Sequence, residues 1–364
     1  MPRRSAVSRL ASSLTRSFTR TLARSITRTA QRSTQALAKE TLRQGKKLTR
    51  QVQKALAPPA PPPGLGDWLS GTAVGPAGAR RYHLFRPAGL VLARGERLPL
   101  LVMLHGCGQH GLEFAASTRM HRVAAHQRWL VLYPEQDRRA NAQGCWNWFA
   151  LRSGQAQAEA ATLVAMLDQV VLAHAADPQR VAVVGLSAGA GMAALLASRY
   201  PARFQAVAMH SGVAPGLAQS TATALRAMRG QQGVASAAQA VGALQGAAGA
   251  GLALPPLLVI QGEGDAVVAP GNARTAAAIW ALATGAAPGP ERMLQRGQRY
   301  AMRVTDYRHQ GKMRVSLCQI EGLGHAWSGG PAKLAHSDPS GPDATGLVWR
   351  FVARAFQQVP LDRT

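Results

Sequence analysis

The pentapeptide Gly-Leu-Ser-Ala-Gly at positions 185–189 constrains the fold more than any other feature of the sequence. It follows the apolar run Val-Ala-Val-Val at 181–184 and opens a small-residue helical pattern over 188–199. Where a strand turns into a helix at G-x-S-x-G, the serine sits in a strained turn with its hydroxyl exposed. Glycines are needed on both sides, since a Cβ atom there would collide with the neighbouring strand and helix. This context predicts Ser187 as a nucleophile, although a serine that only caps the helix fits the same pattern.

Short apolar runs alternate with helical patterns along most of the chain. The apolar runs predict strands at residues 81–86, 100–105, 129–133, 181–185, 206–210, 257–261 and 315–320. The helical patterns predict helices at residues 113–127, 156–175, 188–199, 272–283 and 345–357. Continuous apolar strands separated by helices are typical of a mostly parallel sheet with helices on both faces. The sequence therefore predicts an α/β fold.

Composition divides the chain into three parts. Residues 1–57 contain 14 Lys and Arg and one acidic residue, and they contribute about half of the formal net charge of +25. Residues 58–66 begin with Pro-Pro-Ala-Pro-Pro-Pro, which predicts a stiff, extended linker. Residues 67–360 form the predicted catalytic domain, within which the Ala- and Gly-rich stretch 216–254 is interpreted as a surface insertion.

Two series of residues recur every four positions in the N-terminal segment. The apolar series is Leu10, Leu14, Phe18, Leu22 and Ile26, and the basic series is Arg16, Arg20, Arg24, Arg28 and Arg32. On a helix the two series lie roughly opposite each other, which predicts a basic amphipathic helix suited to an anionic or hydrophobic surface, such as a granule or membrane. A solvated disordered tail and a cleaved targeting peptide fit the same composition. The segment has no recognisable module for reading nucleic acid, and we do not expect nucleic acid as a partner.

A serine nucleophile needs a base, and the base needs an acid that orients it. In α/β-hydrolases the acid and then the histidine follow the serine along the chain. Asp265 comes just after an apolar strand in Gly-Glu-Gly-Asp, where Glu263 is the competing carboxylate. His325 follows the last predicted strand in Gly-Leu-Gly-His-Ala-Trp, whose glycines allow the loop to bring the imidazole over Ser187. This order predicts an α/β-hydrolase fold with Ser187, Asp265 and His325 as the catalytic triad.

An ester-cleaving site also needs two backbone N–H groups aimed at the developing oxyanion. One is expected from Ala188, directly after the nucleophile. The other is expected from His-Gly-Cys-Gly-Gln at 105–109, because its glycines let the backbone approach a substrate closely. An ordinary glycine turn at 105–109 is the alternative.

The three cysteines are Cys107, Cys145 and Cys318, an odd number that does not define a disulfide scaffold. One disulfide with a free thiol and three buried thiols both fit this number. No run approaches the roughly 18 apolar residues of a membrane span, and no ordinary secretory signal is visible.

Together these motifs resemble the polyhydroxybutyrate depolymerase family of esterases, which is related to feruloyl and acetylxylan esterases. The resemblance spans roughly residues 80–355. It includes Leu-His-Gly-Cys-Gly-Gln at 104–109, Gly-Cys-Trp-Asn-Trp-Phe at 144–149, the serine pentapeptide, and Gly-His-Ala-Trp-Ser-Gly-Gly at 324–330. The Cys-Trp-Asn-Trp-Phe and His-Ala-Trp-Ser-Gly-Gly pieces are the most specific.

The resemblance implies a serine hydrolase that cleaves carboxylic esters through an acyl-enzyme, without metal or cofactor. It matches Ser187, Asp265 and His325 to the triad, and Cys107 and Ala188 to the oxyanion donors. The implied substrates are short-chain polyhydroxyalkanoates or 3-hydroxybutyrate oligomers, with soluble esters and oligomers expected more than solid polymer. A feruloyl or acetylxylan type of esterase is the alternative.

The resemblance also pairs Cys107 with Cys145 in a disulfide, and it makes Trp148 and Trp327 apolar walls for an acyl chain, unless these rings only pack the loops. It implies an extracellular enzyme, whereas a cytoplasmic, granule-associated protein is the alternative. A different class of function is an interaction protein that binds a granule, membrane or nucleic acid through residues 1–57. The sequence leaves the oligomeric state open.

Overall fold

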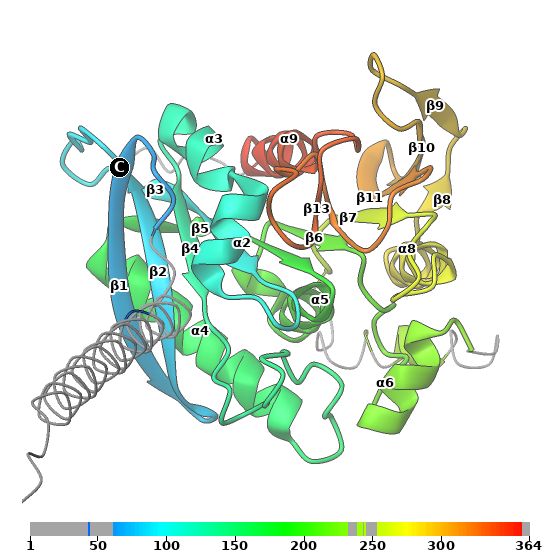
Figure 1. Cartoon of the computed structure of the whole chain (residues 1–364), viewed down its shortest axis with the longest axis horizontal. Coiled ribbons are helices and arrows are strands. Elements are labelled where there is room, and N and C mark those ends of the chain that lie inside the picture. The colour runs from blue at the N-terminus through cyan, green and yellow to red at the C-terminus, as the bar shows by residue number, and fades with distance from the viewer. Residues whose placement is uncertain (1–42, 44–60, 232–238, 243, 245–252, 359–364) are drawn as a thin grey trace, which may run out of the picture. The chain divides into compact units, whose positions relative to one another are not determined.

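The structure is a computed structural model that describes residues 43, 61–231, 239–242, 244 and 253–358 (Figure 1). The chain divides into two units, Met1–Pro59 and Ala60–Thr364. The basic amphipathic helix predicted for residues 1–57 lies outside the described residues apart from Arg43, and it stays a prediction.

A mixed sheet of 11 strands forms the centre of the second unit, in the order β1-β2-β4-β3-β5-β6-β7-β11-β10-β8, with β9 paired to β10. Its strands are β1 (Gly66–Gly75), β2 (Gly78–Pro87), β3 (Leu98–Leu104), β4 (Leu130–Pro134), β5 (Ala176–Leu186), β6 (Ala206–His210), β7 (Leu257–Gly262), β8 (Ala287–Pro288), β9 (Arg292–Leu294), β10 (Met302–His309) and β11 (Lys312–Ile320). The six strands from β4 to β11 in this order pair in parallel, and the pairs at both edges are antiparallel. Two short strands, β12 (Trp327–Ser328) and β13 (Ser337–Asp338), pair separately.

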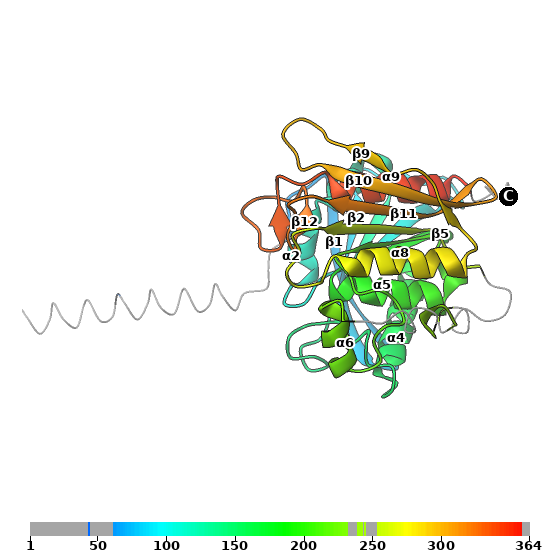
Figure 2. The same cartoon turned by 90° about the vertical axis from the view of Figure 1, so that its right-hand side faces the viewer.

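Helices cover both faces of this sheet (Figures 1 and 2). Helices α4 (Gln155–Ala173), α5 (Ala188–Arg199) and α8 (Gly271–Ala283) pack on one face, and α2 (Gly111–Thr118), α3 (Met120–Gln127) and α9 (Ala344–Phe356) pack on the other. Helix α6 (Thr221–Met228) and the 3-10 turn η1 (Pro201–Arg203) lie outside these two layers. The predicted sheet with helices on both faces is confirmed.

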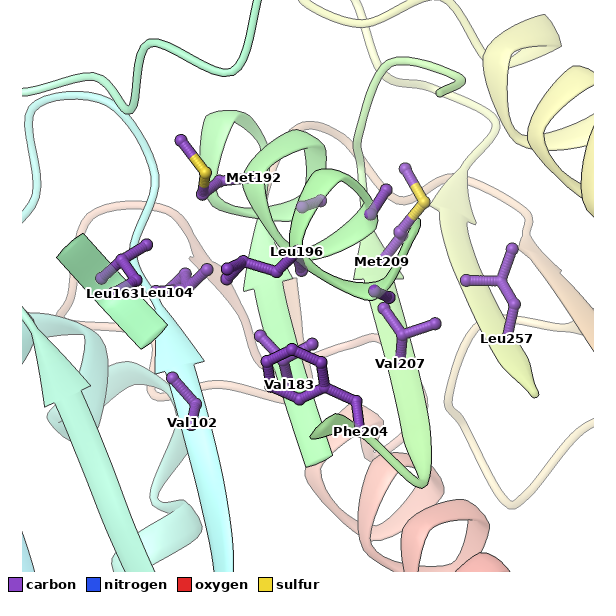
Figure 3. Packing of buried hydrophobic residues seen from close by; sticks show 14 of the residues in the cluster. Val102, Leu104, Leu163, Val183, Met192, Leu196, Phe204, Val207, Met209 and Leu257 are labelled. Atoms are coloured by element: carbon purple, nitrogen blue, oxygen red, sulfur yellow. The ribbon is translucent and has the colours of Figure 1, made fainter. Parts of the chain in front are cut away.

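Along the central strands, alternate residues belong to two separate hydrophobic cores, one on each face of the sheet. Val183 and Val207 join the core beneath α4, α5 and α8 (Figure 3), whereas Val184 and Ala208 join the core beneath α2, α3 and α9. Because both faces of these strands are buried, their sequences read as continuous apolar runs. All seven predicted strands are present, and strand 206–210 and helix 188–199 agree with the structure at both ends.

The prediction of one helix over residues 113–127 is wrong, because the chain forms α2 and α3 with a break at Arg119. Arg119 has a left-handed backbone with φ 52°, and its side chain donates to the Gly329 carbonyl oxygen at 2.5 Å. At this break the Arg119 side chain therefore connects the helical layer to the loop after β12. Because the two residues are far apart in the chain, the local sequence does not predict this contact.

The strands at the sheet edges were not predicted. Strand β10 alternates apolar Met302 and Val304 with polar Arg303 and Thr305, and β1 contains Ser, Thr and Gly. One face of each is partly open to solvent, so neither reads as an apolar run. Helix α6 lies inside the stretch 216–254, which the sequence indicated only as an insertion.

Helix α4 is long and apolar enough to cross a membrane by length and composition, and it is the one such helix in the described part of the chain. Half of its apolar window is buried in the fold, where it packs against β1 and β5. This placement is that of a core helix in a folded domain.

Candidate active site

Ser187 occupies a strained turn between β5 and α5, with φ 56° and ψ −118°. A Cβ atom on Gly185 would lie 2.1 Å from the Gly189 backbone, and one on Gly189 would lie 2.2 Å from the Leu104 carbonyl oxygen. Both glycines of the pentapeptide are therefore sterically required, as the sequence predicted. The Ser187 N–H donates to the His210 carbonyl oxygen at 2.9 Å, which holds the turn against strand β6.

Asp265 follows β7 and is almost fully buried, with 5% of its surface exposed. Its Oδ1 accepts from the backbone N–H groups of Val267 and Val268 at 2.9 and 2.8 Å, and its Oδ2 accepts from the Gln261 amide at 2.9 Å. Burial alone would raise the pKa of Asp265, but the hydrogen bond from His325 and the backbone donors hold it below its usual value. The carboxylate is therefore kept ionised.

His325 donates from Nδ1 to Asp265 Oδ2 at 2.8 Å. This bond leaves Nε2 as the free ring nitrogen, which is the atom that a histidine base uses. The competing carboxylate, Glu263, instead accepts from Gln319 at 3.0 Å and pairs with Arg303. The structure thus brings His325 to Asp265 and not to Glu263.

Ser187, Asp265 and His325 follow β5, β7 and β11, whose carboxyl ends meet at one edge of the parallel sheet. Within the described residues, Ser187 Oγ makes no hydrogen bond, so its contact with His325 is not formed in this structure. Nucleophile–base contacts are often loose without substrate and tighten in the substrate complex.

The loop after β3 lies close to Ser187. A Cβ atom on Gly106 would be 3.5 Å from the Cβ of Ser187. The Gly106 N–H is occupied by Gln109 Oε1 at 2.9 Å, whereas the N–H of Cys107 has no acceptor in the part of the chain described. Ala188 is the first residue of α5, where backbone N–H groups lack helical partners. Both predicted oxyanion donors are thus placed beside Ser187 and left open.

Cys107 and Cys145 form a disulfide that joins the loop 105–109 to the loop 141–149. Backbone and side-chain bonds reinforce this junction: Gly108 N–H donates to Gln143 at 2.9 Å, and the Trp146 indole donates to the His105 carbonyl oxygen at 3.1 Å. The remaining cysteine, Cys318, is buried as a free thiol.

Sequence reasoning missed Glu159, which organises the loop 141–149 from beneath. Glu159 lies on α4, is 1% exposed, and accepts from the backbone and side-chain nitrogens of Asn147 at 2.9 and 2.6 Å. It also accepts from Gln136 at 2.8 Å and lies 3.5 Å from Arg80. The signal for Glu159 in the sequence was an acidic residue within the apolar pattern of the predicted helix 156–175.

His210 at the end of β6 was also missed. Its Nδ1 donates to Ser211 Oγ at 3.1 Å, and its Nε2 accepts from the Ser328 N–H at 3.3 Å, so it holds the loop that carries His325. Burial, aided by the nearby His325, lowers the pKa of His210 to about 3. His210 therefore stays neutral at ordinary pH and can keep accepting that hydrogen bond.

The two tryptophans expected as substrate walls lie in different surroundings. Trp327 is fully buried, stacks on His210, meets Phe114 edge-on and donates to Thr345, which favours the alternative that its ring packs the loop. Trp148 is half-buried against α5, where a Cβ on Gly191 would lie 2.6 Å from its ring. Trp148 alone keeps the role of a wall as a proposal.

Acid is expected to destabilise the fold through its neutral buried histidines. The pKa values of His210, His105 and His121 are about 3, 4 and 4, mainly because of burial, whereas an unfolded histidine titrates near 6.5. Below about pH 6.5 the unfolded chain binds more protons than the folded chain. The stability that these neutral histidines contribute is therefore complete above that pH, and the free energy of unfolding falls as pH drops, by up to about 1.4 kcal/mol per pH unit for each histidine.

Urea unfolding between about pH 7.5 and 4.5 measures this slope. His210→Gln should flatten it and the exposed His126→Gln should not; equal slopes in all three proteins would contradict the assignment.

Loss of the disulfide is expected to lower the free energy of unfolding by about 3–4 kcal/mol, since it closes a loop with a sequence separation of 38. The measurement is urea unfolding of the wild type and of the double variant Cys107→Ser/Cys145→Ser. Reductant should bring the wild type to the stability of the double variant and leave the variant unchanged. A double variant as stable as the oxidised wild type would refute this expectation.

The described residues include no group of three or more His, Cys, Asp or Glu placed to hold a metal ion. What the site does contain is a strained serine between strand and helix, two backbone donors beside it, and a histidine bonded to a buried carboxylate on adjacent loops. This fold and this arrangement are those of the α/β-hydrolase class.

The sequence matches the family model described as "Esterase PHB depolymerase" over residues 80–286, and the chain belongs to this family. It is 38% identical over 115 residues to poly(3-hydroxyalkanoate) depolymerase C of Paucimonas lemoignei, covering 31% of this chain and 28% of that protein. It is 32% identical over 126 residues to feruloyl esterase B of Thermothelomyces thermophilus, covering 35% of this chain and 43% of that protein. The matched part thus spans less than half of these curated relatives.

Among solved structures, the acetyl xylan esterase of Aspergillus awamori superposes with a TM-score of 0.61. The superposition covers 71% of this chain and 94% of that one at 19% sequence identity. At this identity the likeness establishes a shared fold.

Proposed function

We propose that this chain is a serine esterase whose triad is Ser187, Asp265 and His325. The observation that carries the proposal is the 2.8 Å hydrogen bond between His325 Nδ1 and Asp265 Oδ2, at the sheet edge where the Ser187 turn also ends. A histidine oriented by a buried carboxylate beside a strained serine is the arrangement that activates a hydroxyl for acyl transfer. Membership in an esterase family supports the same chemistry.

The proposed reaction has two steps. His325 Nε2 accepts the Ser187 proton as the oxygen attacks the ester carbonyl, and the Cys107 and Ala188 N–H groups hold the oxyanion. Protonated His325 then gives its proton to the leaving alkoxide, which departs as the alcohol. Water attacks the acyl-enzyme with His325 again as base, so that the acid is released and Ser187 is restored. Asp265 stabilises the charged imidazole in both steps.

The proposed substrates are short-chain polyhydroxyalkanoates, in particular 3-hydroxybutyrate oligomers. The depolymerase relative and the family description support this class, whereas the feruloyl esterase relatives support hydroxycinnamate esters as the second candidate. We expect kcat/KM to be highest on 3-hydroxybutyrate oligomers when these are compared with methyl ferulate and p-nitrophenyl butyrate. Faster turnover of methyl ferulate would favour the second candidate.

We also propose that the enzyme works outside the cytosol. The support is the Cys107–Cys145 disulfide, because such bonds persist in oxidising compartments and are rare in the cytosol. Thiol alkylation of the protein in intact producing cells tests the proposal. Free thiols at both positions would favour the cytoplasmic, granule-associated alternative.

A further inference from the structure

A long groove lies between α9 and the antiparallel edge of the sheet, and none of the proposed catalytic residues lines it. Strands β9, β10 and β11 present one face to it, as shown by the pairing of Val304 with Cys318, two residues that both line the groove. Helix α9 packs over the same face (Figure 2). The groove has a volume of about 1090 Å³.

Basic side chains line the strand side of this groove. Arg308 on β10 and Lys312 and Arg314 on β11 line it, and Arg292 and Arg296 join them from β9 and the turn that follows. Arg314 Nε is buried and has no hydrogen-bond partner among the described residues. A buried, unsatisfied guanidinium nitrogen at the groove is costly unless an acceptor reaches it.

The helix side is basic as well. Exposed Arg350 and Arg354 lie one turn apart on α9, and Arg299 adds a third cation from the loop before β10. Arg299, Arg308 and Arg314 donate to the backbone carbonyl oxygens of Gly341, Gly311 and Leu254. Of the eight basic residues that line the groove, Arg292 alone forms an ion pair among the described residues, with Asp306.

The acids that line the groove do not neutralise it. Asp306 is bonded to Arg292 and Ser316, and Asp343 caps α9 by accepting from the Gly346 N–H. The groove thus has eight basic and two acidic residues, compared with 28 and 16 over residues 58–364 as a whole. The ratio of basic to acidic residues is therefore higher in the groove than in residues 58–364 as a whole.

The length of the groove favours an extended anion. From Lys312 to Cys318 the β11 wall is roughly 20 Å long, so an extended chain that lies along it meets basic side chains from both walls. Guanidinium groups spread along such a length match a row of phosphates, each of which accepts paired N–H bonds.

We propose that this groove binds an extended single-chain phosphate polymer, either inorganic polyphosphate or the backbone of a single-stranded nucleic acid. The chain lies along β11 beneath α9, with its charges met by the arginines on both walls. This binding is independent of ester hydrolysis, which takes place at Ser187.

The test uses the full chain with short-chain polyphosphate, a single-stranded oligonucleotide of similar charge, and inorganic phosphate. We expect the polymers to slow amide hydrogen exchange in residues 292–312 and 344–356, and monomeric phosphate to have little effect. Arg350→Gln/Arg354→Gln should weaken binding about tenfold or more and lower the salt slope of log K by about 1.4, whereas Arg94→Gln/Arg122→Gln, which removes two exposed charges outside the groove, should not.

The arms of the test also identify the source of the phosphates. Protection by polyphosphate alone identifies the inorganic chain, and protection by the oligonucleotide identifies nucleic acid. Protection confined to residues 1–57, or equal loss in the two double variants, would overturn the proposal. Both double variants should hydrolyse p-nitrophenyl butyrate at the wild-type rate, so failure of the groove proposal and failure of the esterase proposal are distinguishable.

Discussion

Replacing Ser187 by alanine is expected to lower kcat for p-nitrophenyl butyrate by about 10⁵–10⁶-fold while the protein stays folded. In the proposed mechanism the Ser187 hydroxyl is the attacking group. Among the described residues, no other serine occupies a strand-to-helix turn with a closely packed glycine on each side. Alanine also has a Cβ atom, so it fits wherever serine fits in this backbone. The checks are initial rates with purified protein and circular dichroism for the fold.

Ser198 on the same helix provides a matched control. It is buried, and its hydroxyl donates to the Leu195 carbonyl oxygen at 3.0 Å within α5. Ser198→Ala should therefore keep the wild-type kcat to within a few-fold. If Ser187→Ala and Ser198→Ala were equally active, the nucleophile would have to be sought elsewhere.

Asp265→Asn is expected to lower kcat by about 10⁴-fold. An asparagine would keep the shape of the side chain, but its amide can donate to His325 and stabilise the wrong tautomer, and the negative charge that stabilises the imidazolium would be gone. The two backbone N–H groups that now meet Asp265 Oδ1 would still find an amide oxygen, so the loop after β7 should keep its form. Rates at saturating substrate and thermal unfolding measure the two effects separately.

Glu263 supplies the decisive comparison, since it lies two residues away and was the competing acid in the sequence. It pairs with Arg303 on β10 and Gln319 on β11, away from His325. Glu263→Gln should leave kcat nearly unchanged and cost at most about 1 kcal/mol of stability, as expected for a partly exposed ion pair. A larger kcat loss for Glu263→Gln than for Asp265→Asn would reverse the assignment of the acid.

The sequence predicted most of the parallel centre and the order of the candidate triad, because both are encoded locally. Buried parallel strands read as apolar runs, and the Ser187 turn requires glycines that can be seen in the sequence. The edge strands, the break at Arg119 and helix α6 could not be read in the same way. They depend on one-sided burial or on a distant carbonyl, such as that of Gly329.

The sequence by itself determined that Ser187 sits between a strand and a helix, and that an acid and a histidine follow it in the order of an α/β-hydrolase. Only the tertiary structure decided which carboxylate meets His325, because Glu263 and Asp265 both follow β7 within three residues and the loop turns them in different directions. It also showed that Trp327 is buried against Phe114 and His210, a contact that depends on how the loops pack. The same physical reason applies to the basic groove: its arginines are scattered over residues 292–354, and only the pairing of β10 with β11 beneath α9 brings them to one face.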